Sequence, residues 1–317
     1  RYFADASYRY DGSSQFGSNK RFAPFWSLGA GWNVHEESFM EDMNSVNRLK
    51  LRYSYGYTGS QNFPSYMGIT TSKYYTDRDY RYNIGTYLLG YGNDNLQWQR
   101  TIKSNFGMDL EFFNRKLSLT LDYFSEKTQG SVISVTSAPS TGFTTYSENI
   151  GDVVNKGWEF KTRYTLLDDP NSRNQISLFL NAFHVNGTIE KISNALEEAN
   201  EANANALSTN PLPRYVEGRS TTAIWAVPSV GIDPSTGREA FLTRDGMYTT
   251  VYDPANQIVA GDSRADIEGS FGTSMEYKGI GLNLYFGYRL GGQTYNQTLV
   301  ERVEGADLNF NVDQRVF

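Results

Sequence analysis

The chain alternates apolar and polar residues along segments of about ten residues. In residues 49–58, LKLRYSYGYT, one face carries Leu49, Leu51 and a series of tyrosines, and the other face carries Lys50 and Arg52. A period of two places successive side chains on opposite faces of a β-strand. Similar segments recur at 117–123, 158–164 and 280–289. Strands of this length, with one apolar, aromatic-ended face and one polar face, are typical of outer-membrane β-barrels.

The alternation assigns side chains to two surfaces of the predicted barrel wall. We expect the apolar set to face lipid: Leu49, Leu51, Leu119, Leu121, Phe160, Leu282 and Leu284. We expect the polar set to face the lumen: Lys50, Arg52, Asp122, Glu159, Lys161, Arg163 and Arg289.

The connections between the predicted strands differ strongly in length. The strands are expected at about 1–9, 24–33, 48–58, 97–113, 116–126, 155–167, 175–186, 267–277 and 280–290. Connections at 114–115, 168–174 and 278–279 are turn-sized, whereas those at 59–96, 127–154 and 187–266 are long. Bacterial barrels have short periplasmic turns and long extracellular loops, so the strand at 48–58 is predicted to run outward. Residues 33–47 are predicted to form a short amphipathic turn.

The predicted strands do not close a barrel by themselves. Bacterial single-chain barrels have even strand numbers, and an unpaired backbone group in lipid costs several kcal/mol. Residue 1 already lies in an alternating segment, with no initiator Met or leader before it. We therefore expect the chain to be a fragment whose remaining strands belong to the same polypeptide.

Composition is compatible with this class and excludes others. The chain has 29 Lys and Arg against 35 Asp and Glu, a net charge of −6, so nothing favours nucleic-acid binding. A mean hydropathy of −0.54 does not exclude a barrel, because only alternate residues meet lipid, and an aromatic content of 15% favours one. The chain contains no run of 18 apolar residues, so no transmembrane helix is predicted. The absence of Cys excludes disulfides and thiolate metal sites.

Possible catalytic groups have simpler structural interpretations. Asp168 and Asp169 fall in a predicted turn, and the acidic residues within 194–207 fit a solvated helix inside a long loop. His35 and His184 have no partners at metal-ligand spacing. The segment 233–237, DPSTG, predicts a β-turn with Gly at a positive φ rather than a calcium loop. We therefore predict no enzyme, no cofactor and no metal.

Five ordered segments resemble SusC/RagA-type TonB-dependent transporters. They are RYDGSSQFGSNKRFAPFWSLGAGWNV at 9–34, LKLRYSYGYTGSQ at 49–61, ENIGDVVNKGWEF at 148–160, GIDPSTGREAFLTRDG at 231–246, and GSFGTSMEYKGIGLNLYFGYRLGG at 269–292. Two departures lie at loop edges: NDNLQWQ at 93–99, where the family has NP-x-LKWE, and Ala265, where Pro is common.

The resemblance implies a fold and a function. Residues 1–317 would form part of the C-terminal domain of an all-β, antiparallel transmembrane barrel of about 22 strands, with an N-terminal plug and the first strands absent from this chain. Such transporters import oligosaccharides or peptides across the outer membrane of Gram-negative bacteria of the Bacteroidetes type. They work with a SusD-like surface lipoprotein that acts as a lid, and they couple to the TonB complex through the N-terminal part.

Aromatic residues in the long loops are the candidates for substrate contact. Their rings stack on sugars or clamp peptide side chains, and guanidinium groups hydrogen-bond to polar groups. An alternative is that the tyrosines pack a rigid rim or contact the lid, since Tyr is enriched in interfaces. The predicted substrate-binding residues are Tyr66, Tyr74, Tyr75, Tyr80, Arg81, Tyr82 and Trp225. The predicted anchors for the lipoprotein are Tyr80, Arg81, Tyr82, Arg219 and Trp225.

Two other functions are compatible with the alternating pattern. A passive porin would share the alternation but lack the ordered family motifs and the plug. A β-rich surface adhesin or glycan-binding protein would show alternation without a lipid-facing apolar set. The ordered motifs favour the transporter.

Overall fold

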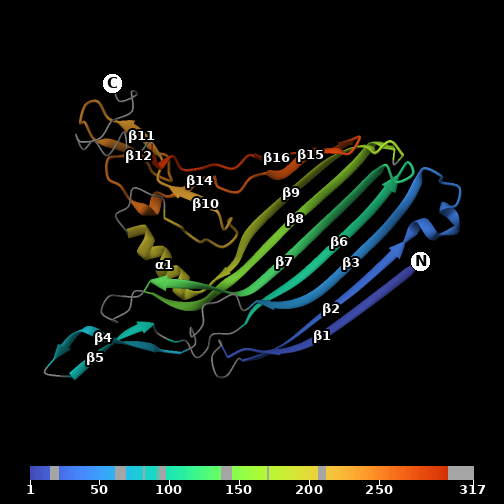
Figure 1. The fold of residues 1–317 in the computed structure, drawn as a ribbon. Helices are drawn as coiled ribbons and strands as arrows, with labels where there is room; N and C mark the ends of the chain where they lie inside the picture. Colours follow the sequence, from blue (N-terminus) through green and yellow to red (C-terminus); the bar gives the residue numbers. More distant parts are fainter. Residues whose placement is uncertain are drawn as a thin grey trace.

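A nine-stranded antiparallel sheet is the largest sheet of the described structure (Figure 1). The computed structural model describes residues 1–14, 21–60, 69–80, 83–90, 92, 98–136, 145–169, 171–205 and 212–298. The strand order is β1-β2-β3-β6-β7-β8-β9-β15-β16. Their bounds are β1 Tyr2–Gly12, β2 Phe22–Asn33, β3 Val46–Ser60, β6 Gln99–Phe112, β7 Leu117–Thr136, β8 Thr145–Asp169, β9 Asn174–Ile192, β15 Ile267–Tyr277 and β16 Ile280–Leu290.

These strands confirm the nine predicted from alternation, and β15 and β16 have the predicted bounds. The prediction for 127–154 was wrong in extent, because that segment is not all loop. Strands β7 and β8 continue pairing past Thr128, through a register shift, as far as Thr136 opposite Thr145. In water, unlike in lipid, the free edges of a two-stranded ribbon can hydrogen-bond to solvent, so such a ribbon can extend beyond the sheet.

The register separates the two predicted side-chain sets. Across four strands, Leu51 lies opposite Met108, Met108 opposite Leu121, and Leu121 opposite Phe160. One position further along, Arg52, Gly107, Asp122 and Glu159 form the corresponding row on the other face. The sheet therefore has one apolar face and one polar face, and the predicted sets occupy them as expected.

The apolar face is not covered by any described element. Leu282 of β16 is 49% exposed and Leu121 of β7 is 37% exposed. Large apolar side chains left open to the surroundings on a continuous sheet face are compatible with contact to lipid and not with a buried sandwich core.

Short turns gather at one end of the sheet and long segments at the other, as Figure 1 shows. We call these the turn end and the loop end. At the turn end, Lys278 and Gly279 join β15 to β16 with φ of 49° and 88°. Positive φ at both central residues is the type I′ geometry that matches the twist of paired strands. The predicted two-residue turn is confirmed.

The connection at 33–47 also lies at the turn end and contains two short 3₁₀ turns, Val34–Glu36 and Ser38–Met40. Val34 is buried, and the guanidinium group of Arg1 forms an ion pair with Glu37 in this segment. None of the described helices is long and apolar enough to cross a membrane.

The two other long connections also contain more structure than predicted. Residues 59–96 include a hairpin of β4 (Thr71–Tyr80) and β5 (Asn83–Gly90). Residues 187–266 include the end of β9, the helix α1 (Asn194–Asn205), the pair β10 (Ala223–Ala226) and β14 (Ile258–Asp262), and a three-stranded sheet of β11 (Ser229–Ile232), β12 (Glu239–Leu242) and β13 (Tyr248–Thr249). We call residues 187–266 the loop module.

The buried apolar residues lie mostly near the loop end. Phe25 and Trp98 meet edge to face, with 5.2 Å between ring centroids, and the Trp98 Nε1 donates to the carbonyl of Arg21. Within the loop module, Ile189, Leu196 and Trp225 are buried. A small core therefore fixes the structured loops onto the sheet.

Candidate functional site

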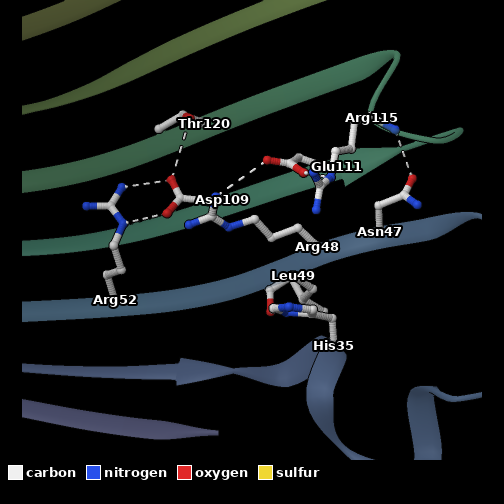
Figure 2. Close-up of polar contacts among 9 residues, drawn as sticks. All are labelled: His35, Asn47, Arg48, Leu49, Arg52, Asp109, Glu111, Arg115 and Thr120. Atoms are coloured by element: carbon white, nitrogen blue, oxygen red, sulfur yellow. Dashed lines mark hydrogen bonds and ion pairs between the residues drawn. The ribbon is translucent and has the colours of Figure 1, made fainter.

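Ion pairs cross the strands on the polar face of the sheet, and Figure 2 shows the group at its turn end. Arg52 of β3 donates through Nε and Nη2 to the carboxylate of Asp109 on β6, and Nη2 also reaches Asp122 on β7, 3.1 Å away. Arg48 and Arg115 both pair with Glu111. Opposite charges on adjacent strands fix the register and make this face hydrophilic.

A cavity of about 470 Å³ opens on the same polar face further along the sheet. Its lining includes Lys161, Arg163, Asn181 and Tyr285. Polar and cationic side chains in a recess can hydrogen-bond to a hydrophilic solute.

The β4–β5 hairpin carries three of the predicted substrate-binding residues, Tyr74, Tyr75 and Tyr80. Tyr75 packs against Tyr87, with 4.8 Å between ring centroids, and Tyr74 is 66% exposed. Tyr80 lies in β4 opposite Asn83. Tyr66, Arg81 and Tyr82 lie outside the described residues. The hairpin thus offers one paired ring and one exposed ring.

Helix α1 holds a neighbouring loop segment in place. The side chain of Asn200 accepts from the backbone N–H of Tyr215 and donates to its carbonyl, at 2.8 and 2.6 Å, and Asn203 donates to the carbonyl of Pro213. Leu196 is buried. The predicted helix is confirmed, but it is not simply a solvated helix. Two of its asparagine side chains form hydrogen bonds with the backbone of residues 213–215.

Trp225 on β10 lies in the interior of the loop module. Its side chain is only 6% exposed, and the guanidinium carbon of Arg214 lies 5.2 Å from the ring centroid. Both residues line a cavity of about 490 Å³, together with Arg219 and Arg244. In Figure 1 the hairpin that carries Tyr74 and Tyr75 lies apart from β10. The described members of the predicted set are therefore not gathered into one site.

Two aspartates organise the turns of the loop module. Asp262 on β14 accepts from the Thr222 hydroxyl at 2.6 Å and from the backbone N–H of Arg264 at 2.9 Å. Burial raises the pKa of Asp262, but hydrogen bonds from Ser220, Thr222 and Arg264 outweigh burial and hold that pKa below its ordinary value.

Asp233 begins the turn that was predicted at 233–237. It accepts from the backbone and side chain of Ser235 and from the hydroxyl of Thr236. These hydrogen bonds, with the Ser235 backbone first, lower the pKa of Asp233. Gly237 has a φ of 66°, so the β-turn interpretation is confirmed.

Both histidines have structural hydrogen bonds. The Nδ1 of His35 lies 3.1 Å from the Leu49 carbonyl, and the Nδ1 of His184 lies 2.6 Å from the Asp266 carbonyl. Within the described residues, no group of three His, Cys, Asp or Glu side chains is arranged to hold a metal ion.

Arg219 and Trp225 were predicted as anchors, but the sequence did not indicate that Arg214 and Arg244 line the same cavity. Arg214, Arg244 and Gln257 come from separate segments of the loop module, and Gln257 links the two arginines: its side chain accepts from Arg214 and its carbonyl accepts from Arg244, both at 3.1 Å. No spacing in the sequence indicates this contact, because Arg214 and Gln257 lie 43 residues apart in the chain.

Known proteins share the sequence features of this chain. The family model described as TonB dependent receptor-like, beta-barrel matches residues 1–313. TonB-dependent receptor P3 of Formosa agariphila is 28% identical over 327 aligned residues, which cover 96% of this chain and 32% of that protein. SusC of Bacteroides thetaiotaomicron is 34% identical over 168 residues, covering 50% of this chain and 17% of SusC.

Solved structures share the fold. The RagAB peptide importer in the closed-closed state superposes with a TM-score of 0.82 and 23% identity, covering 100% of this chain and 35% of that one. The open-open state gives a TM-score of 0.70 over 92% of this chain. The chain spans about a third of the length of these proteins. The resemblance to SusC/RagA-type proteins is confirmed, and the chain belongs to the TonB-dependent receptor-like β-barrel family.

Proposed function

We propose that this chain forms part of the wall of a TonB-dependent importer in the outer membrane of a Bacteroidetes-type bacterium, and that the complete protein takes up oligosaccharides or peptides. The observation that carries the proposal is the nine-stranded sheet with an open apolar face and an ion-paired polar face. A wall of this kind separates lipid from an aqueous lumen. The family relationship adds active import to that architecture.

The rest of the barrel and a plug would come from other parts of the polypeptide. Among the described residues, β1 and β16 each have one neighbouring strand only. An open edge in lipid leaves backbone groups unsatisfied, so both edges require partners. We propose that residues 1–317 belong to the C-terminal barrel domain, that the barrel has about 22 strands, and that an N-terminal plug contacts TonB.

The structured loop end would face outward and receive the lipoprotein and the substrate. The β4–β5 hairpin and the loop module are ordered assemblies, larger than barrel closure requires, and ordered loops of this size usually carry function. The exposed Tyr74 ring is available to a solute or to a partner. The buried Trp225 would act through the cavity that it lines rather than through an open surface.

The partner is tested by isolating the full-length protein from native membranes in a mild detergent. We expect a second, lipidated protein near one-to-one stoichiometry and an intact mass for the transporter far above 35.8 kDa. An intact mass equal to 35.8 kDa would contradict the fragment and the large barrel. Isolation of the transporter always alone would contradict the lipoprotein lid.

The role of the hairpin is tested by deleting β4 and β5 and by the single change Tyr74→Ala, with Lys73→Ala on the same strand as the matched control. We expect the deletion and Tyr74→Ala to weaken partner retention or substrate uptake, and the control to leave both unchanged. Heat-dependent gel mobility reports whether the barrel stays folded. Uptake independent of TonB in the unmodified protein would identify a passive pore instead.

A further inference from the structure

The cavity of about 490 Å³ in the loop module has an unusual combination of donors. Arg214, Arg219 and Arg244 line it. None of the ion pairs within the described residues involves these three guanidinium groups. Three like charges around one recess repel one another unless an anion enters, so the cavity favours an anionic occupant.

Two of the guanidinium groups are held in position. Arg214 stacks on the indole of Trp225 and donates to the Gln257 side chain, while Arg244 donates to the Gln257 carbonyl. A guanidinium fixed by a cation–π contact and one hydrogen bond keeps further N–H groups to donate. The arrangement is therefore organised before any ligand arrives, which reduces the entropic cost of binding.

Trp225 adds an independent observation. Its side chain is 6% exposed, and its Nε1 has no hydrogen-bond partner within the described part of the chain. A buried N–H without an acceptor has lost its hydrogen bonds to water without replacement, so such groups usually have a partner in the working state of a protein. A ligand oxygen would supply the missing acceptor.

We propose that this cavity binds a carboxylate carried by the imported substrate. Planar guanidinium groups bind carboxylates in bidentate geometry, and Val216, Ile258 and Val259 provide an apolar wall for the carbon skeleton that bears the carboxylate. The two substrate classes of the proposed function both carry this group, as an acidic residue of a peptide or as a uronic acid of an oligosaccharide. The inference rests on the proposed function and narrows it to acidic substrates.

Calorimetric titration of the full-length complex with matched probes tests the inference. One pair of probes is an amidated hexapeptide with a single Glu and its Gln counterpart, and the other is a trigalacturonate and its methyl ester. We expect the acid of at least one pair to bind about tenfold more tightly than its neutral counterpart. A preference confined to one pair identifies the source of the carboxylate.

Variants locate the effect. Arg219→Gln and Arg244→Gln should each remove most of the acid preference without disturbing the Trp225 stack, and Arg214→Gln should remove it as well. Arg238→Gln, in the turn after β11, removes the same charge from the loop module outside the cavity and should preserve the preference. Hydrogen exchange in β14 verifies that each variant keeps the module folded.

Two outcomes overturn the inference. One is equal affinity for acid and neutral probes in both pairs, and the other is an acid preference that persists in the Arg219→Gln/Arg244→Gln double variant. If neutral substrates are still imported in a TonB-dependent manner, only the carboxylate site is wrong. If no oligosaccharide or peptide is imported at all, the proposed function itself is wrong.

Discussion

Arg52 of β3 donates two hydrogen bonds to Asp109 of the neighbouring strand β6, from Nε at 3.0 Å and from Nη2 at 3.2 Å (Figure 2). The same guanidinium also pairs with Asp122 of β7, so one cation serves two carboxylates on two strands. Bidentate geometry makes such pairs stronger and more directional than ordinary surface ion pairs. Arg52 therefore connects three strands of the wall.

Replacing Arg52 with Met should destabilise the barrel by about 1–3 kcal/mol, because Asp109 and Asp122 lose their shared partner. Lys103→Met is the matched control, because Lys103 forms a single cross-strand ion pair, with Glu126, and this pair is more exposed than those of Arg52. Its loss should lower the free energy of unfolding by less than about 1 kcal/mol. Urea unfolding of the full-length protein in detergent measures both. Equal effects of the two substitutions would contradict a special role for Arg52.

A charge on the apolar face should prevent correct assembly in a depth-dependent way. Leu121→Arg places a cation among Met108 and Phe160, and an Arg near the bilayer midplane costs about 2–4 kcal/mol. Leu119→Arg should cost less, because residue 119 lies closer to the turn that precedes β7 at Leu117. Thr120→Arg, on the polar face, is the control and should fold. Heat-dependent gel mobility after membrane extraction measures folding. If Thr120→Arg failed to fold while Leu121→Arg folded, this orientation of the wall would be excluded.

The turn between β15 and β16 should be sensitive to residue type. Gly279 has a φ of 88°, so Gly279→Val introduces a β-branched side chain where L-residues are strained and should destabilise the hairpin by about 1–2 kcal/mol. Lys278→Asn should be neutral or stabilising, because Asn-Gly is the preferred pair for a type I′ turn. The midpoint of thermal unfolding should therefore fall in Gly279→Val and should stay unchanged or rise in Lys278→Asn. Equal shifts would argue against the type I′ geometry.

Acid should loosen the loop module before the barrel. Hydrogen bonds lower the pKa of Asp262 in the folded state, so its contribution to stability is present above the unfolded pKa of about 3.9 and is lost as the pH falls through the lower, folded pKa. Hydrogen-exchange protection in β10 and β14, corrected for the intrinsic rate, should decrease below about pH 4.

Asp262→Asn is the matching variant for this titration. Its module should be less protected than the original at neutral pH, and the acid-dependent loss should be reduced. An unchanged acid response in Asp262→Asn would show that another carboxyl group, such as Asp233, controls the transition.

The sequence by itself determined the nine strands of the sheet, the two faces, the turn at 278–279 and the family. The prediction of a turn at 168–174 was too long, because Asp168 and Asp169 pair with Gln175 and Asn174 at the ends of β8 and β9. Alternation in 49–58 or 280–289 is a local property, and a strand of period two cannot change its register by one residue without exposing its charged side chains to lipid. The sequence therefore predicted correctly that Leu121 and Asp122 lie on opposite faces.

The tertiary structure alone decided how the long connections fold. The prediction treated 127–154 as a loop and 187–266 as a loop with one helix, although these segments also contain extended strands and two small sheets. Trp225 was predicted from its aromatic ring, but nothing in the sequence indicates that Arg214 stacks on it or that Gln257 joins Arg214 to Arg244. Those residues are brought together by packing between segments far apart in the chain. The sequence pattern does not predict such contacts, because each one depends on how the other segments fold and pack.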